Sequence, residues 1–117
     1  KKIYDGLILS KSLMTWFEEK YLIKSNLKDW RVAPILYKDL SNLAPSLIIV
    51  AGCDPLRDEG IAYGKALKKA GNKSEIKIFN GQIHGFLTMG ARISDTNKLI
   101  NLVCNRINKS FYKENEF

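Results

Sequence analysis

Two strand-like segments on either side of a helix-like segment constrain the fold of this chain more than any other feature. Residues 47–51 form an unbroken apolar run, which is typical of a strand buried on both faces of a parallel sheet. Residues 75–79 alternate, with a lysine between two isoleucines, as in a strand at the edge of a sheet. Between them, residues 58–70 carry apolar side chains at helical spacing. The sequence therefore predicts an α/β fold with two parallel strands joined by a right-handed helical crossover.

The segment before the first strand is expected to hold one helix and a long connection. The helix covers about residues 12–24, and Ser10 or Ser12 is a suitable cap. In residues 25–45, Pro34 disfavours the α conformation at the preceding residue and so ends any helix there. The apolar positions at helical spacing in the first helix are Leu13, Met14, Phe17, Tyr21 and Leu22.

The ends of the other two helices carry recognisable signals. Asp58 favours the N-terminus of the middle helix, and Gly71 is suited to the position just beyond its C-terminus. A last helix, capped by Ser94 or Asp95, is expected to run to about Lys109. Its apolar stripe consists of Leu99, Ile100, Val103, Ile107 and, at its end, Phe111.

Asp54 and His84 are the candidate functional residues, because each lies shortly after one of the expected strands. The carboxyl ends of parallel strands meet at one edge of a sheet, where α/β proteins hold reacting groups. A carboxylate that accepts a hydrogen bond from one ring nitrogen fixes the histidine tautomer, and the other nitrogen then takes a proton from a nucleophile. The alternative is that His84 is an ordinary surface residue and that Asp54, before Pro55, only starts a turn or the next helix.

Composition argues against several other functions. The formal net charge is +7, but the lysines are scattered along the chain, so no specific nucleic-acid binding is expected. No apolar run approaches the roughly 20 residues of a membrane span. Two cysteines without a Cys-x-x-Cys spacing indicate reduced thiols and a cytoplasmic protein. One histidine without ligand-type neighbours predicts no metal site.

Longer strings around the two candidate residues carry a family resemblance. Residues 54–60 read Asp-Pro-Leu-Arg-Asp-Glu-Gly, and residues 84–86 read His-Gly-Phe. Segments 12–17, 31–36 and 39–45 extend the pattern upstream. With these strings the chain resembles the hormone-sensitive-lipase-like branch of the α/β-hydrolase esterases and lipases.

The resemblance implies one partial α/β-hydrolase domain. Residues 1–45 would precede the acid strand, and residues 46–117 would supply strand, helix, strand and helix. Asp54 would be the triad acid and His84 the general base of a serine esterase or lipase that acts on small carboxylic esters. The reaction would pass through an acyl-serine intermediate and need no cofactor.

The nucleophile of such a triad is missing from the sequence. The family places it in Gly-x-Ser-x-Gly, and none of the eight serines nor either cysteine has glycines at that spacing. A triad histidine without a nucleophile forms no acyl-enzyme. We therefore expect the C-terminal segment of an esterase, inactive without the N-terminal portion that carries the nucleophile and the oxyanion hole. The alternative is a non-catalytic interaction module or a decayed pseudoenzyme fragment with a basic surface.

Two further expectations concern surfaces. The apolar edge of the strand at residues 47–51 would lack a neighbour, so we expect this edge to pair either with a second copy of the chain in a homo-oligomer or with the missing N-terminal portion. Trp16 and Phe17 are expected to pack into a core or under a cap, with the lining of a substrate pocket as the alternative. Leu56, Phe86 and Leu87 adjoin the acid and the histidine and are candidates for the border of that pocket, with ordinary packing as the alternative.

Overall fold

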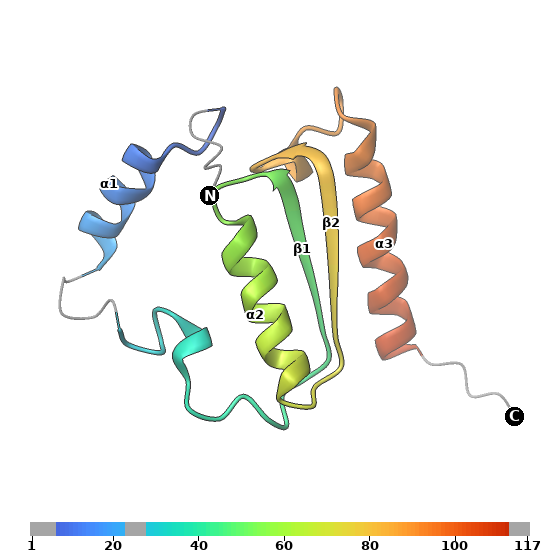
Figure 1. The fold of residues 1–117 in the computed structure, drawn as a ribbon. Coiled ribbons are helices and arrows are strands. Elements are labelled where there is room, and N and C mark those ends of the chain that lie inside the picture. Colours follow the sequence, from blue (N-terminus) through green and yellow to red (C-terminus); the bar gives the residue numbers. More distant parts are fainter. Residues whose placement is uncertain (1–6, 23–27, 113–117) are drawn as a thin grey trace, which may run out of the picture. The chain divides into compact units, whose positions relative to one another are not determined.

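The structure, a computed structural model, describes residues 7–22 and 28–112. Figure 1 shows the order of its elements. These are α1 (Lys11–Tyr21), the 3-10 turn η2 (Pro34–Leu36), β1 (Ser46–Cys53), α2 (Arg57–Lys69), β2 (Ser74–Ile83), the 3-10 turn η3 (Phe86–Thr88) and α3 (Ser94–Phe111). The described residues fall into two compact units that divide between His84 and Gly85.

The strands β1 and β2 pair in parallel, which confirms the predicted strand–helix–strand unit. Ile48 lies opposite Ile76 in the register. Both strands are longer than predicted, because pairing resumes between Cys53 and Ile83 after a shift of register that follows Ala51. The handedness of the crossover stays a prediction.

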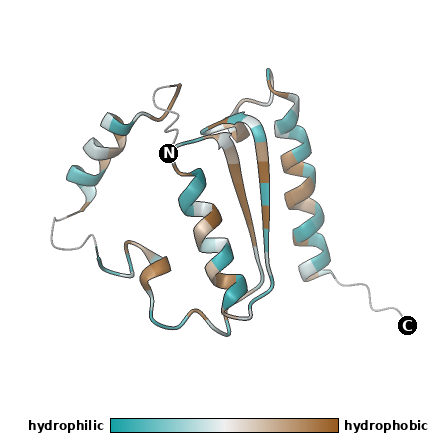
Figure 2. Cartoon of the chain, in the orientation of Figure 1, coloured by the Kyte–Doolittle hydropathy of each residue, from teal (hydrophilic) through white to brown (hydrophobic). Residues whose placement is uncertain are grey.

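β1 is less buried than its unbroken apolar run predicts. Val50 and Ala51 are buried, but Leu47, Ile48 and Ile49 are only half-buried. The physical reason lies in the sheet, because in the described part of the chain β1 pairs with β2 alone. Figure 2 shows the hydrophobic colour that runs along β1 toward its carboxyl end. The predicted burial on both faces is therefore wrong for the first half of the strand.

α2 packs closely on the sheet because two of its glycines, one turn apart, face the strands. A Cβ atom on Gly60 would lie 2.7 Å from Cγ1 of Val50, and one on Gly64 would lie 2.6 Å from Cγ1 of Ile76. Both distances are well inside van der Waals contact, so the approach of the helix depends on the absence of these side chains. The first turn of α2, which leads out of the loop after β1, is thereby held near the strands.

The C-terminus of α2 is closed as the sequence predicts. Gly71 has a φ of 90°, in the left-handed region that favours glycine. Its N–H donates to the carbonyl of Lys68, and the N–H of Asn72 donates to the carbonyl of Leu67, both at 3.1 Å. These two bonds are the Schellman pattern, which satisfies carbonyls left over at a helix end.

Asn72 fastens the connection before β1 to the end of α2. Its Oδ1 accepts from the N–H of Leu43 at 2.8 Å. Its Nδ2 donates to the carbonyls of Leu40 at 2.6 Å and Leu67 at 3.0 Å. One side chain thus joins two segments that are about thirty residues apart in the sequence.

α1 begins at its predicted cap, but its apolar residues are not buried. The Oγ of Ser10 accepts from the N–H of Leu13 at 3.1 Å. Trp16 and Phe17 are 50% and 52% exposed, and their ring centroids lie 5.2 Å apart in an edge-to-face arrangement. Within the described residues the two rings do not pack into a core, whereas their packing under a cap stays a prediction. The helix ends at Tyr21, because Leu22 is extended with φ −107° and ψ 132°, so the predicted end at about residue 24 is wrong.

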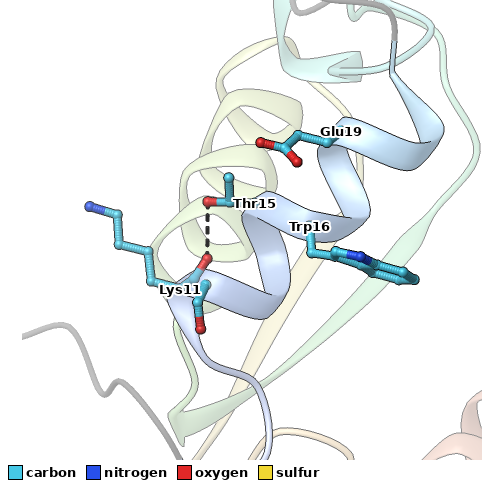
Figure 3. A pocket seen from close by; sticks show the side chains of 5 residues that line it. Lys11, Thr15, Trp16 and Glu19 are labelled. Carbon is cyan, nitrogen blue, oxygen red and sulfur yellow. Dashed lines mark hydrogen bonds between the residues drawn. The ribbon is translucent and has the colours of Figure 1, made fainter.

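The shallow pocket in Figure 3 lies on α1 alone. Its lining consists of Lys11, Ser12, Thr15, Trp16 and Glu19. The hydroxyl of Thr15 donates to the carbonyl of Lys11 at 3.1 Å. Trp16 lines this pocket, but neither Asp54 nor His84 belongs to the lining, so the predicted alternative of a substrate pocket stays a prediction.

A turn in the connection holds a carboxylate beside an arginine. The side chain of Arg31, and then its backbone N–H, hydrogen-bond to Asp29 and lower the pKa of that carboxyl to about 2. A lowered pKa stabilises the fold above the ordinary pKa of the acid, and this contribution is lost as the pH falls through about 2. Because Arg31 is exposed, the contribution is small.

We expect an NMR titration to show this shift directly. The carboxyl carbon of Asp29 should titrate with a midpoint near a pKa of about 2. Arg31→Gln should raise the midpoint toward the ordinary value of about 3.9, because the guanidinium is gone while the backbone N–H of residue 31 still donates to the carboxylate. An unchanged midpoint in the variant would show that Arg31 does not hold the carboxylate in solution.

α3 is slightly longer than predicted and starts without a side-chain cap. Ile93 occupies the capping position, so the predicted caps Ser94 and Asp95 are wrong. Instead, the carboxylate of Asp95 accepts from Nζ of Lys98 at 2.7 Å. Most of the predicted stripe is exposed, since only Leu99 is buried among its five residues.

Candidate active site

Asp54 and His84 lie together at the carboxyl ends of the two strands. Asp54 follows the last residue of β1, and His84 follows the last residue of β2. The Nδ1 of His84 and the Oδ2 of Asp54 are 2.8 Å apart. The aspartate side chain is 12% exposed and the histidine side chain 38% exposed. The pair is thus a mostly buried carboxylate joined to an imidazole that solvent reaches.

The second oxygen of the Asp54 carboxylate is held by the backbone of the following turn. Oδ1 accepts from the N–H of Leu56 at 2.8 Å. The carbonyl of Asp54 accepts from the N–H of Arg57 at 3.1 Å, which closes the turn into α2. An aspartate that hydrogen-bonds two residues ahead is a common start for such turns. The turn and the contact with His84 are therefore not alternatives, because one carboxylate makes both.

A close approach of the two strands brings the histidine beside the acid. Between the pairs Ala51–Phe79 and Cys53–Ile83, β1 has one residue and β2 has three. At that point a Cβ atom on Gly52 would overlap the backbone of Asn80. Only glycine allows the strands to approach so closely. After the shift of register, the end of β2 pairs with β1 again, so His84 lies next to Asp54.

The residue after His84 turns the chain sharply. Gly85 has a φ of 74°, which a residue with a Cβ rarely adopts. An Nδ1–H that donates to Asp54 leaves Nε2 as the basic nitrogen of the neutral ring. The arrangement is suited to the removal of a proton from a hydroxyl group by Nε2.

The three predicted pocket residues differ in burial. Phe86 is buried at 5% exposure, and its carbonyl accepts from the hydroxyl of Thr96 at 2.7 Å. Leu56 and Leu87 are 36% and 52% exposed. A role of Phe86, Leu56 and Leu87 at the border of a pocket stays a prediction.

Sequence reasoning overlooked Arg57 as part of this arrangement. Its Nη1 donates to the carbonyl of Gly52 at 2.9 Å, and its Nε donates to Oδ1 of Asp58 at 3.0 Å. The only signal in the sequence was its position inside the string that contains Asp54. Nothing in that string indicates that the side chain reaches back to the preceding strand.

Two other kinds of feature do not occur in the part of the chain that the structure describes. It contains no group of three or more His, Cys, Asp or Glu side chains arranged to hold a metal ion. It also contains no helix with the length and apolar character to span a membrane.

The sequence matches known hydrolases over most of its length. Residues 1–88 match the family described as alpha/beta hydrolase fold. Carboxylic ester hydrolase LipN of Mycobacterium tuberculosis is 43% identical over 102 residues, which are 82% of this chain and 27% of the relative. Ethyl acetate hydrolase of Pseudomonas putida is 34% identical over 95 residues, which are 80% of this chain and 30% of the relative. The chain thus spans less than a third of the length of these curated relatives.

The fold matches solved structures of the same class. A hyperthermophilic esterase from the archaeon Pyrobaculum calidifontis superimposes with a TM-score of 0.87 at 34% identity, over 92% of this chain and 36% of the esterase. Vibralactone cyclase gives a TM-score of 0.87 at 27% identity, over 98% of this chain and 33% of the cyclase. In both comparisons nearly the whole chain corresponds to about a third of the larger protein.

Proposed function

Because this chain belongs to the α/β-hydrolase fold family, with esterases among its relatives, we propose that it supplies the acid and the base of an ester-hydrolysing triad. The observation that carries the proposal is the 2.8 Å contact between Nδ1 of His84 and Oδ2 of Asp54 at the ends of neighbouring parallel strands. The nucleophilic serine and the oxyanion hole would come from residues outside these 117.

The proposed chemistry assigns one task to each side chain. Asp54 accepts the hydrogen bond from Nδ1–H, fixes the tautomer and stabilises the imidazolium when it forms. Nε2 of His84 removes the proton of the serine hydroxyl as its oxygen attacks the ester carbonyl. The imidazolium then returns this proton to the leaving alkoxide, and water releases the acid from the acyl-serine by the same steps in the second half.

Small carboxylic esters are the proposed substrates. The support is the pair of relatives named as a carboxylic ester hydrolase and as an ethyl acetate hydrolase. The proposed cycle needs no cofactor, because the proton moves between side chains, substrate and water only.

A chimeric enzyme tests the proposal. In it, this chain replaces the matched segment of LipN, which shares 43% identity with it and contributes the remainder of the hydrolase. The chimera is expected to hydrolyse p-nitrophenyl acetate and butyrate, whereas the 117-residue chain alone is expected to show no activity above buffer, because it lacks Gly-x-Ser-x-Gly. Activity of the chain alone, or a folded chimera without activity, would contradict the proposal.

We also propose that the free edge of β1 pairs with a strand of that remainder. In the described part of the chain this edge has no strand beside it, and such edges pair readily with other chains. Light scattering in the same experiment should find self-association for the chain alone and a monomer for the chimera. A dilute monomeric chain would show that the edge needs no partner.

A further inference from the structure

Arg57 spans the loop that carries the acid. It is the first residue of α2, and its side chain reaches back to the strand that precedes Asp54. Nη1 donates to the carbonyl of Gly52 at 2.9 Å, and Nε donates to the carboxylate of Asp58 at 3.0 Å. The side chain of Arg57 is 31% exposed; its bond to Gly52 is partly buried, whereas its bond to Asp58 is exposed. The cation therefore ties β1 to the first turn of α2 on both sides of Asp54.

The carbonyl that Arg57 binds belongs to the irregular point of the sheet. Gly52 lies within the shift of register, where one residue of β1 faces three of β2. It is buried, and a buried carbonyl needs a hydrogen-bond donor. A charged donor such as guanidinium forms a shorter and stronger bond than a neutral one. The contact thus fixes the place where the chain leaves the strand, two residues before the acid.

Three hydrogen bonds close the six residues from Gly52 to Arg57. The carbonyl of Gly52 binds Nη1 of Arg57, the Oδ1 of Asp54 binds the N–H of Leu56, and the carbonyl of Asp54 binds the N–H of Arg57. With these bonds in place, Oδ2 is the carboxylate oxygen that meets Nδ1 of His84. Of the three bonds, the one to the carbonyl of Gly52 depends on the arginine side chain, whereas the N–H of Arg57 that binds Asp54 belongs to the backbone.

We propose that Arg57 is a positioning residue that holds the Asp54 carboxylate within hydrogen-bond distance of His84. It thereby selects the neutral tautomer of His84 with the proton on Nδ1. The inference deepens the proposed function, since this is the tautomer that leaves Nε2 free to act as a base.

The tautomer of His84 is the direct readout. It is the only histidine of the 117-residue chain, so its ring nitrogen signals in ¹⁵N-labelled protein need no assignment by mutation. In the neutral ring, the wild-type chain should show mainly the Nδ1–H form. In Arg57→Gln the ratio of Nδ1–H to Nε2–H tautomer should fall roughly tenfold, the size expected for the loss of one hydrogen bond to a charged group.

Two matched variants separate positioning from general effects. Arg57→Lys keeps a cationic donor for the carbonyl of Gly52 and should retain most of the Nδ1–H form. Arg92→Gln makes the same chemical change at an exposed arginine of the second unit and should leave the ratio unchanged. Amide dispersion and circular dichroism establish that each variant is folded.

Each outcome decides the matter. A folded Arg57→Gln chain with the wild-type tautomer ratio overturns the proposal. So does a loss of folding in both Arg57→Gln and Arg57→Lys, because Arg57 would then serve the fold rather than the acid. The readout involves no ester, so a failure here leaves the triad standing, whereas an inactive chimera with the Nδ1–H tautomer intact counts against the triad alone.

Discussion

His84→Ala is expected to lower kcat of the chimeric enzyme for p-nitrophenyl butyrate by about 10⁴-fold or more, because no other group removes the proton from the nucleophile. The imidazole is 38% exposed, so its removal costs little packing, and the variant should fold like the parent. Steady-state kinetics should show the loss in kcat with little change in KM, since the ring contacts the reacting proton rather than the ester groups.

Asp54→Asn tests whether the carboxylate fixes the tautomer of His84. The amide still presents an oxygen to the N–H of Leu56, so the turn into α2 is preserved. Its NH₂ group would face Nδ1 of His84 and favour the wrong tautomer, which is expected to lower kcat by about 10⁴-fold. Asp95→Asn, at a half-buried acid of α3 paired with Lys98, is the matched control and should change kcat by less than about twofold. Equal losses in the two variants would show that carboxylates matter here only through the general charge of the chain.

Gly52→Ala is expected to destabilise the chain by about 3 kcal/mol, at the upper end of what overpacking costs. The added methyl group would overlap the backbone of Asn80, and a backbone cannot rotate away as a side chain can. Separation of the strands at this point would break the pairing of Cys53 with Ile83 and move His84 away from Asp54. Urea unfolding monitored by circular dichroism measures the loss.

Gly81 provides the control for this substitution. It lies in β2 close to the same point of the sheet and is exposed. A Cβ atom added to it would have no other atom within 4 Å. Gly81→Ala should change the free energy of unfolding by less than about 1 kcal/mol, and toward stability if at all. If the two alanine variants unfold at the same urea concentration, the close approach of Gly52 to Asn80 does not exist in solution.

The parts of the fold that the sequence predicts are those governed by local chemistry. The apolar run of β1, the alternation of β2 and the helical period of α2 lie within single segments, and the parallel order follows from the helix between the strands. Gly71 ends α2 because a left-handed residue is needed there. The acid and the histidine come together because parallel strands end at the same edge. Cys53 and Cys104 are free, while the cytoplasmic location inferred from them stays a prediction.

The parts that the sequence does not predict depend on segments far apart in the chain. The close approach at Gly52 involves the backbone of Asn80. The bond from the Arg57 side chain involves the carbonyl of a strand residue that no periodic pattern indicates. The exposure of Trp16 depends on which surfaces are present to cover it. Helical spacing shows that one face of a helix is apolar, but not what covers that face.

The side chain of Asn72 has a further consequence for the way this chain opens. Its bonds to Leu40 and Leu43 act as a reversible cross-link between the lead into β1 and the end of α2. A protease cuts within residues 40–43 only after these hydrogen bonds break, because proteases bind the substrate segment in an extended form that is detached from the fold. The rate of limited proteolysis in that surface segment therefore measures how often the contact with Asn72, some thirty residues further along the sequence, opens.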